Sequence, residues 1–179
     1  MVESETGLEL HVIDGTEEAR LSAQGVLLGW PGSYGLVCDI GGSSMELAEI
    51  SDGVVGKRVS SSLGPQRLMS VQGGKKARKE IIRSTIQKLH EELGPQHNRL
   101  FLVGGSWRAI ARIDMERRGY PLHVLHEYRM SRNAVTATAE YIAKNAEETT
   151  RALSGHSSSR MNVVPTPRDV PQQVVREFG

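Results

Sequence analysis

Two short apolar segments joined by a glycine turn constrain this chain more than any other feature. Residues 36–40 and 45–50 each have a strand-like composition, and residues 41–44 between them begin with two glycines. Apolar runs separated by such a turn predict an antiparallel hairpin. A turn centred in the middle of residues 41–44 pairs Asp39 directly with Glu46, so the two carboxylates share one face of the hairpin.

Asp39 and Glu46, here called the acid pair, suggest a cation site. Like charges that face each other across two strands repel, and a bound cation or a retained proton relieves that repulsion. One or two carboxylates together with phosphate and water form the usual surroundings of Mg²⁺. The turn adds backbone N–H groups for an anion, and its residues are Gly41, Gly42, Ser43 and Ser44. A glycine-rich hairpin with two solvated acids is the equally simple alternative.

The rest of the chain predicts alternating strands and helices. A third strand over residues 54–60 would complete an antiparallel meander, and an apolar stripe predicts a helix over residues 77–93. Near the N-terminus we expect a strand over residues 8–13 and a helix that begins near Glu17. Later in the chain we expect a strand over residues 99–103, which Gly104 and Gly105 join to a helix capped by Ser106. A last helix should begin at its cap, Ser131. We expect one domain over residues 1–153 and a loosely ordered tail over residues 154–179.

Composition excludes several classes of protein. Lys and Arg total 22 against 21 Asp and Glu, and aromatic residues make up 4% of the chain, so neither the basic excess nor the stacking surface of a nucleic-acid binder is present. We therefore expect no DNA partner. The single cysteine, Cys38, and the lack of a signal peptide or a membrane-length apolar run favour the cytoplasm and no membrane association.

Five ordered segments resemble the Ppx/GppA phosphatases, which are exopolyphosphatases and guanosine pentaphosphate phosphohydrolases of the actin-like ATPase superfamily. Residues 39–47 are similar to the second phosphate loop of that family, Asp-Ile-Gly-Gly-Gly-Ser-Thr-Glu-Leu. Residues 12–21 are similar to its Ile-Ser-Gly-x-Glu-Glu-Ala-Arg-Leu segment, and residues 60–68 to its Leu-Gly-x-x-Arg-Leu segment. Residues 102–113 and 125–131 match two later segments. The resemblance implies an α/β, ribonuclease H-like half-domain with a mixed sheet and flanking helices.

The resemblance also implies roles for individual residues. Glu18 falls on the proposed catalytic glutamate, which positions or deprotonates the attacking water, and Asp39 and Glu46 fall on the metal and phosphate-site acids. The implied cofactor is Mg²⁺, and the implied substrate is polyphosphate or guanosine pentaphosphate. Phosphate contacts are expected from the backbone of two glycine segments, namely Gly41, Gly42, Ser43 and Ser44 in the first and Gly104 and Gly105 in the second.

This sequence differs from the family pattern at three places. Ser43 replaces the third glycine of the loop, which matters if that position needs positive φ, and Met45 replaces a threonine beside the acid pair. The family's first phosphate loop would precede Leu8, so we expect one half of a two-half enzyme, completed by a homo-oligomer or a separately encoded first half. The helix that carries Glu18 would expose an apolar surface to that partner through Leu21, Val26, Leu27, Leu28 and Trp30. A non-catalytic phosphate- or nucleotide-binding fragment and an actin-like sugar kinase fragment are the alternatives.

Overall fold

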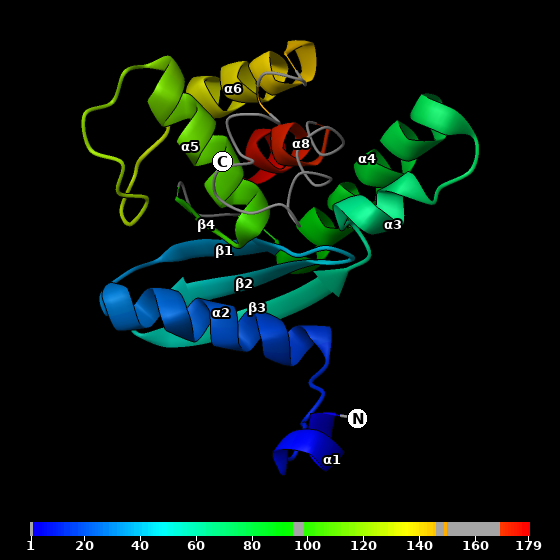
Figure 1. Ribbon diagram of the computed structural model, residues 1–179, viewed down its shortest axis with the longest axis vertical. Helices are drawn as coiled ribbons and strands as arrows, with labels where there is room; N and C mark the ends of the chain where they lie inside the picture. The colour runs from blue at the N-terminus through cyan, green and yellow to red at the C-terminus, as the bar shows by residue number, and fades with distance from the viewer. Residues whose placement is uncertain (1, 95–98, 146–148, 150–168) are drawn as a thin grey trace.

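A four-stranded sheet lies at the centre of the protein (Figure 1). The computed structural model describes residues 2–94, 99–145, 149 and 169–179. The strands follow the order β3-β2-β1-β4, and they are β1 (Gly35–Ile40), β2 (Met45–Ser51), β3 (Val54–Ser61) and β4 (Leu100–Val103). The first three form an antiparallel meander, whereas β4 pairs in parallel with β1. The predicted meander and the mixed character of the sheet are confirmed.

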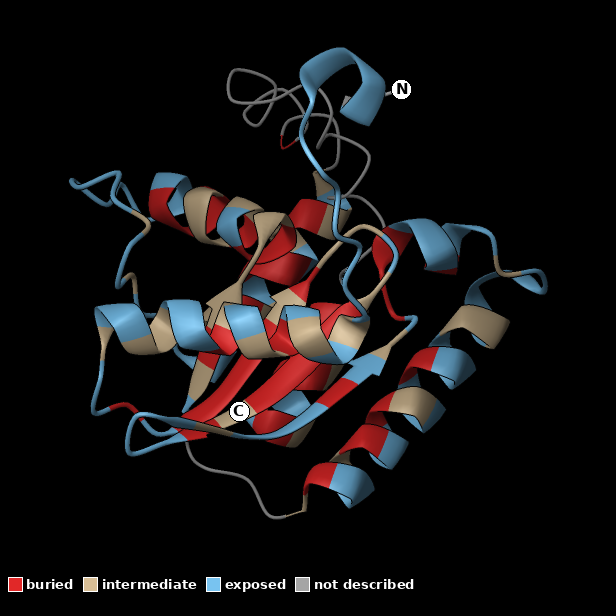
Figure 2. Cartoon of the chain, turned by 90° about the horizontal axis from the view of Figure 1, so that it is seen from below, coloured by how far each residue is buried: buried red, intermediate tan, exposed pale blue. Residues whose placement is uncertain are grey.

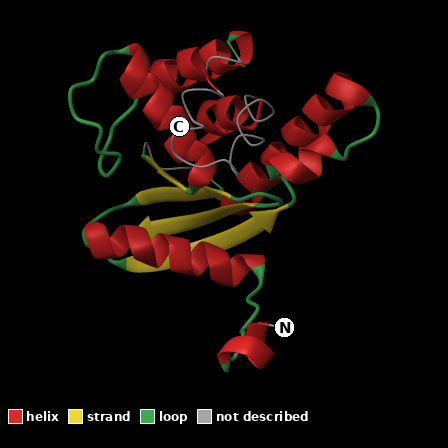
Figure 3. Ribbon diagram, in the orientation of Figure 1, coloured by secondary structure: helices red, strands yellow, loops and turns green. Residues whose placement is uncertain are grey.

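Helices cover the two faces of the sheet unequally (Figure 3). Among the described helices, α2 (Gly15–Gly29) covers one face, and a helical layer covers the other. That layer contains α4 (Gly74–Leu93), α5 (Gly105–Arg117), α6 (Arg132–Lys144) and α8 (Asp169–Phe178). Two short helices, α1 (Val2–Thr6) and α3 (Pro65–Met69), were not predicted from the sequence.

The alternation of side chains along β1 builds two separate cores. Leu36, Cys38 and Ile40 enter the larger core, under α4, α5, α6 and α8, whereas Val37 faces the smaller core under α2. Successive strand residues point to opposite faces of a sheet, so Asp39 shares the α2 face with Val37. The long helix α4 buries Ile82, Ile86, Leu89 and Leu93 in the larger core, which confirms the predicted helix and most of its apolar stripe.

The expected strand over residues 8–13 is absent. The segment is irregular, and its apolar side chains Leu8, Leu10 and Val12 are exposed, Val12 by 98%. Figure 2 shows α1 and this segment in the colour of exposed residues, extending away from the buried strands. Alternating apolar residues predict a strand, but a strand also needs a neighbouring strand for its backbone groups, and none of the described strands lies beside this segment.

The prediction of a loosely ordered tail is wrong for residues 169–178. Asp169–Phe178 form α8, whose side chains Val170, Val174 and Phe178 are buried in the larger core. They recur at i, i+4 and i+8, which places them on one face of the helix. Pro171 lies in the first turn, where a missing N–H group removes no helical hydrogen bond. The remainder of the expected tail, up to residue 168, lies outside the described residues.

Part of the α2 surface that we expected to face a partner packs against the sheet of this chain instead. Val26, Leu27 and Trp30 pack against the smaller core, and Trp30 meets Phe101 of β4 edge to face at 5.5 Å between ring centroids. Leu21 and Leu28 are exposed. The apolar surface that we expected on this helix is therefore reduced to these two side chains.

Candidate functional site

The sheet register places four residues in one row. Ser60 of β3 pairs with Glu46 of β2, Glu46 pairs with Asp39 of β1, and Asp39 pairs with Val103 of β4. The predicted opposition of Asp39 and Glu46 is thus confirmed. The row lies where β1 and β4 both end and glycine segments follow. Two backbone turns and two carboxylates therefore meet at one edge of the sheet, the edge formed by the C-terminal ends of β1 and β4.

Glu46 is the most deeply buried acid of this row, with an exposed fraction of 1%. Its Oε1 accepts a hydrogen bond from Ser60 Oγ at 2.9 Å, whereas its buried Oε2 has no hydrogen-bond partner. Burial raises the pKa of Glu46; hydrogen bonds from Ser44 and Ser60 oppose this, and the charges of Glu18 and Asp39 add to it. A buried carboxylate with one unsatisfied oxygen, near two other acids, is typical of a site that accepts a cation or a proton.

Asp39 is half-buried and contacts two other elements. Its Oδ2 accepts a hydrogen bond from Ser22 Oγ of α2 at 2.7 Å. Its Oδ1 lies so close to Gly104 that a Cβ at that glycine would overlap it. Gly104 also has a φ of +94°, a conformation that favours glycine. Glycine at position 104 is therefore required by both its backbone conformation and the Asp39 carboxylate.

The first turn of α2 brings Glu18 to the same region. Asp14 caps the helix by accepting hydrogen bonds from Glu17 N at 2.8 Å and Thr16 Oγ1 at 2.7 Å, and these contacts lower the pKa of Asp14. Glu18 is exposed, and its charge acts on buried Glu46. The structure therefore groups Glu18 with the acid pair, although the three residues come from three different elements, α2, β1 and β2.

The loop between β1 and β2 keeps a compact shape despite its serine. Gly41 N donates to Ser44 O at 3.1 Å, and Gln66 N donates to Gly42 O at 2.9 Å. Gly64 passes so close to the Ser43 backbone that a Cβ at residue 64 would overlap it. Ser43 has no positive φ, so the conformational objection to serine at this position is removed.

Met45 does not face the acid pair. Its side chain is fully buried in the larger core, on the opposite face of the sheet. The replacement of threonine by methionine therefore changes the core behind the site, and Asp39 and Glu46 keep their common face.

The second glycine segment begins α5, and its cap differs from the prediction. Gly104 is the N-cap of α5, so Ser106, which we expected to cap the helix, lies inside the first turn. Ser106 is buried and its Oγ has no hydrogen-bond partner. Gly104 lies against the Asp39 carboxylate, and no side chain caps α5. Uncapped N–H groups at a helix N-terminus favour an anion.

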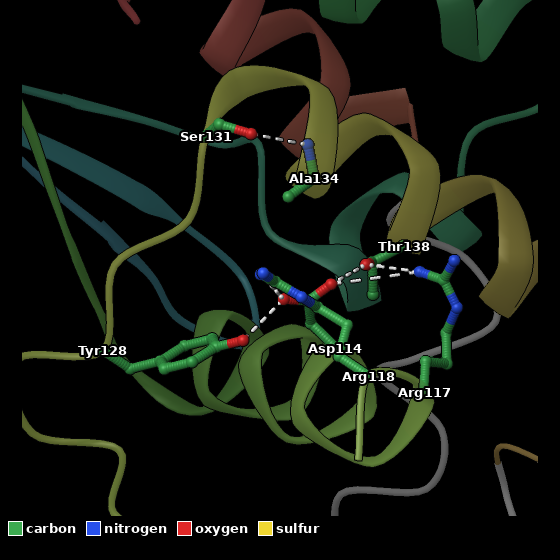
Figure 4. Close-up of polar contacts among 7 residues, drawn as sticks. All are labelled: Asp114, Arg117, Arg118, Tyr128, Ser131, Ala134 and Thr138. Carbon is green, nitrogen blue, oxygen red and sulfur yellow. Dashed lines mark hydrogen bonds and ion pairs between the residues drawn. The ribbon is translucent and has the colours of Figure 1, made fainter. Parts of the chain in front are cut away.

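A buried acid on α5, which the sequence analysis missed, holds the loop that follows this helix (Figure 4). Asp114 accepts hydrogen bonds from Tyr128 Oη at 2.6 Å and Thr138 Oγ1 at 2.8 Å, and Arg118 lies 3.5 Å away. Burial and the Asp114 carboxylate raise the pKa of Tyr128. Arg117 also donates to Thr138 at 2.8 Å. These contacts join α5, the 119–131 loop and α6, and they support the helix that Gly104 precedes.

The protein side chains of the site do not by themselves complete a metal centre. Within the described ranges, no group of three or more His, Cys, Asp or Glu side chains is arranged to hold a metal ion by itself. The unsatisfied Glu46 Oε2 and the facing Asp39 carboxylate offer the oxygen ligands that Mg²⁺ prefers, with phosphate and water supplying the rest. The donor set therefore fits a magnesium ion shared with a phosphate.

A model of the Ppx/GppA phosphatase family matches residues 1–178. The chain belongs to the Ppx/GppA phosphatase family. No match was found among curated proteins. This Ppx/GppA chain also resembles solved structures at low sequence identity, and those likenesses concern the fold.

An exopolyphosphatase from Cytophaga hutchinsonii superposes with a TM-score of 0.80 at 19% identity, over 99% of this chain and 61% of that one. An exopolyphosphatase-like protein gives a TM-score of 0.81 at 24% identity, over 98% and 59% of the two chains. The Ppx/GppA family member of Aquifex aeolicus gives 0.72 at 18% identity, over 99% and 60%. The matches show the actin-like ATPase type of α/β fold, and this Ppx/GppA chain spans about three-fifths of each matched structure.

In the described part of the chain, no helix combines the length and apolar character needed to cross a membrane.

Proposed function

We propose that this Ppx/GppA chain carries the acid pair and water-activating residue of a Mg²⁺-dependent phosphohydrolase of the exopolyphosphatase type. The observation that carries the proposal is the row in the sheet that sets Asp39 opposite Glu46, with Glu18 of α2 beside them. Family membership supports the same chemistry. The reaction removes the terminal phosphate of polyphosphate or guanosine pentaphosphate.

The roles of the residues follow from their positions. Exposed Glu18 orients the attacking water and accepts its proton. Backbone N–H groups of residues 41–44 and of Gly104 and Gly105 contact phosphate oxygens, because both segments end strands at the edge that holds the acid pair. Asp39 and Glu46 hold Mg²⁺, which when bound supplies positive charge against the developing charge of the phosphate. No side-chain nucleophile takes part.

The same proposal covers substrate, location and partners. Polyphosphate and guanosine pentaphosphate share the phosphoanhydride that the site would hydrolyse, so both are substrates to be tested. A cytoplasmic location agrees with a single buried cysteine, Cys38. A second copy or a separately encoded first half is the proposed protein partner, and exposed Leu21 and Leu28 of α2 are available to contact it.

The experiment measures binding and turnover separately. Release of orthophosphate from polyphosphate and from guanosine pentaphosphate is followed with Mg²⁺ and with EDTA, and binding of each compound is measured in parallel. Glu18→Gln should abolish turnover and leave binding intact, while its neighbour Glu17→Gln, whose carboxylate bonds Arg20, serves as the control. Mg²⁺-dependent binding without turnover would favour the non-catalytic binding fragment, and neither binding nor turnover would contradict both functions.

A further inference from the structure

Asp39 accepts a hydrogen bond from Ser22 and Glu46 accepts one from Ser60, and these two serines come from different elements. Ser22 of α2 donates to Asp39 Oδ2 at 2.7 Å, and Ser60 of β3 donates to Glu46 Oε1 at 2.9 Å. The partners are 17 and 14 residues apart in the chain, so neither contact arises from local turn geometry. Both depend on the packing of α2 and β3 around β1 and β2.

The α2 helix is held at two points on either side of Glu18. Gly15 packs directly against Ser60, since a Cβ at residue 15 would overlap the Ser60 hydroxyl and lie 3.5 Å from Glu46 Oε1. Ser22, two turns further along, bonds Asp39. Residues 15, 18 and 22 are spaced i, i+3 and i+7, which places them along one side of the helix. The helix therefore cannot shift Glu18 along the sheet without disturbing one of the two contacts.

Each hydroxyl also determines which carboxylate oxygen remains for a ligand. A serine hydroxyl has one proton to donate. Ser60 donates its proton to Glu46 Oε1, and Ser22 donates its proton to Asp39 Oδ2. The Oε2 atom of Glu46 is thereby left without a partner. Groups that hydrogen bond a metal-binding carboxylate fix its orientation and strengthen binding.

We propose that Ser22 and Ser60 are positioning residues that fix the two carboxylates for Mg²⁺ and fix Glu18 relative to both. The inference rests on the proposed function, because it assigns the serines to the magnesium site of that function. Neither serine was singled out by the sequence analysis. The predicted consequence is a loss of Mg²⁺ affinity that is not matched by a loss of stability.

The test compares serine variants in the full chain by calorimetric titration with Mg²⁺ and by thermal unfolding. Ser22→Ala and Ser60→Ala should each weaken Mg²⁺ binding by about 10- to 100-fold, the usual effect of removing a group that orients a metal ligand. Ser22→Thr keeps the hydroxyl and should restore affinity. Ser84→Ala is the matched control, because Ser84 is an exposed helical serine whose hydroxyl bonds only its own helix, at Ile81 O.

The possible results separate the two proposals. The positioning role is supported if the alanine variants bind Mg²⁺ more weakly without a matching fall in unfolding temperature and Ser22→Thr restores the affinity. Wild-type affinity in both alanine variants would overturn that role and leave the proposed function intact. Equal losses of affinity in Ser22→Ala and Ser22→Thr, accompanied by lower unfolding temperatures, would show a structural role and also overturn it. No Mg²⁺ binding by the wild type would contradict the metal site of the proposed function and this inference together.

Discussion

Replacing Glu46 by glutamine should stabilise the metal-free protein at neutral pH. Directly paired strand residues have Cβ atoms about 5 Å apart, and two carboxylate charges at that separation repel by about 3 kcal/mol at an effective dielectric constant near 20. Glu46 faces Asp39 and has 1% exposure, so solvent screens this repulsion weakly. Because hydrogen bonds from Ser44 and Ser60 offset part of the repulsion, we expect a gain of about 1 to 3 kcal/mol, allowing for about 1 kcal/mol per hydrogen bond.

The pH dependence of this gain follows from the raised pKa of Glu46. The folded protein retains the Glu46 proton at pH values where the unfolded chain has released it, so the free energy of unfolding of the wild type falls as pH rises through this interval. The loss is complete above the folded-state pKa and absent below the ordinary glutamate pKa. Glu46→Gln does not titrate, and its advantage over the wild type should therefore appear as pH rises.

Thermal and urea unfolding in EDTA, across a pH series, measure this effect. For a chain of this length each kcal/mol corresponds to about 2 to 4 °C in unfolding temperature. Glu49→Gln on the same strand is the control, since Glu49 contacts the Lys57 backbone at 3.3 Å and lies on the other side of the strand alternation. A clear destabilisation by Glu46→Gln at neutral pH would show that repulsion from Asp39 does not destabilise the fold and would identify Glu46 as a purely structural hydrogen-bond acceptor.

Three further substitutions test the surroundings of the site. Gly104→Ala should lower the free energy of unfolding by about 2 kcal/mol or more and weaken Mg²⁺ binding, because it adds a clash with Asp39 to the strain of positive φ. Gly119 also has positive φ but has open space around it, so Gly119→Ala should lower the free energy of unfolding only by the strain, about 1 to 2 kcal/mol. Phe178→Ala should lower the free energy of unfolding in urea by about 3 to 5 kcal/mol, because Phe178 of α8 is buried in the core. Leu28 is exposed, so Leu28→Ala should change the free energy of unfolding by less than about 0.5 kcal/mol. Asp114→Ala removes two short hydrogen bonds to a buried carboxylate and should lower the free energy of unfolding by about 3 kcal/mol or more. An unchanged unfolding midpoint would exclude a supporting role for this acid.

The hairpin and the long helix were predictable because local rules determine them. A glycine turn between two apolar runs fixes the strand register, and the register alone sets Asp39 opposite Glu46. The helix α4 follows from a 3.6-residue apolar period over many turns. The hairpin carries most of the site residues that the sequence indicated.

The remaining elements depend on contacts that a single sequence does not display. The α8 helix is short, follows two prolines and contains a third, so its apolar face at Val170, Val174 and Phe178 is recognisable only once the core beneath it is known. The contacts of Ser22 and Ser60 with the acid pair join different elements, and serine has no pattern that marks such a role. Asp114 precedes two arginines on a helix, a spacing typical of a solvated ion pair, and its burial is set by the 119–131 loop and α6.

The most direct test of the central claim is calorimetric titration of the chain with linear tripolyphosphate, with Mg²⁺ and with EDTA. Binding should require Mg²⁺ and should weaken at least about tenfold in Asp39→Asn, since one metal-binding carboxylate is lost. Asp52→Asn, a change at an exposed turn residue with φ +51° that asparagine also tolerates, should bind like the wild type. Binding of equal strength in EDTA, or unchanged binding by Asp39→Asn, would contradict the assignment of the acid pair as a magnesium and phosphate site.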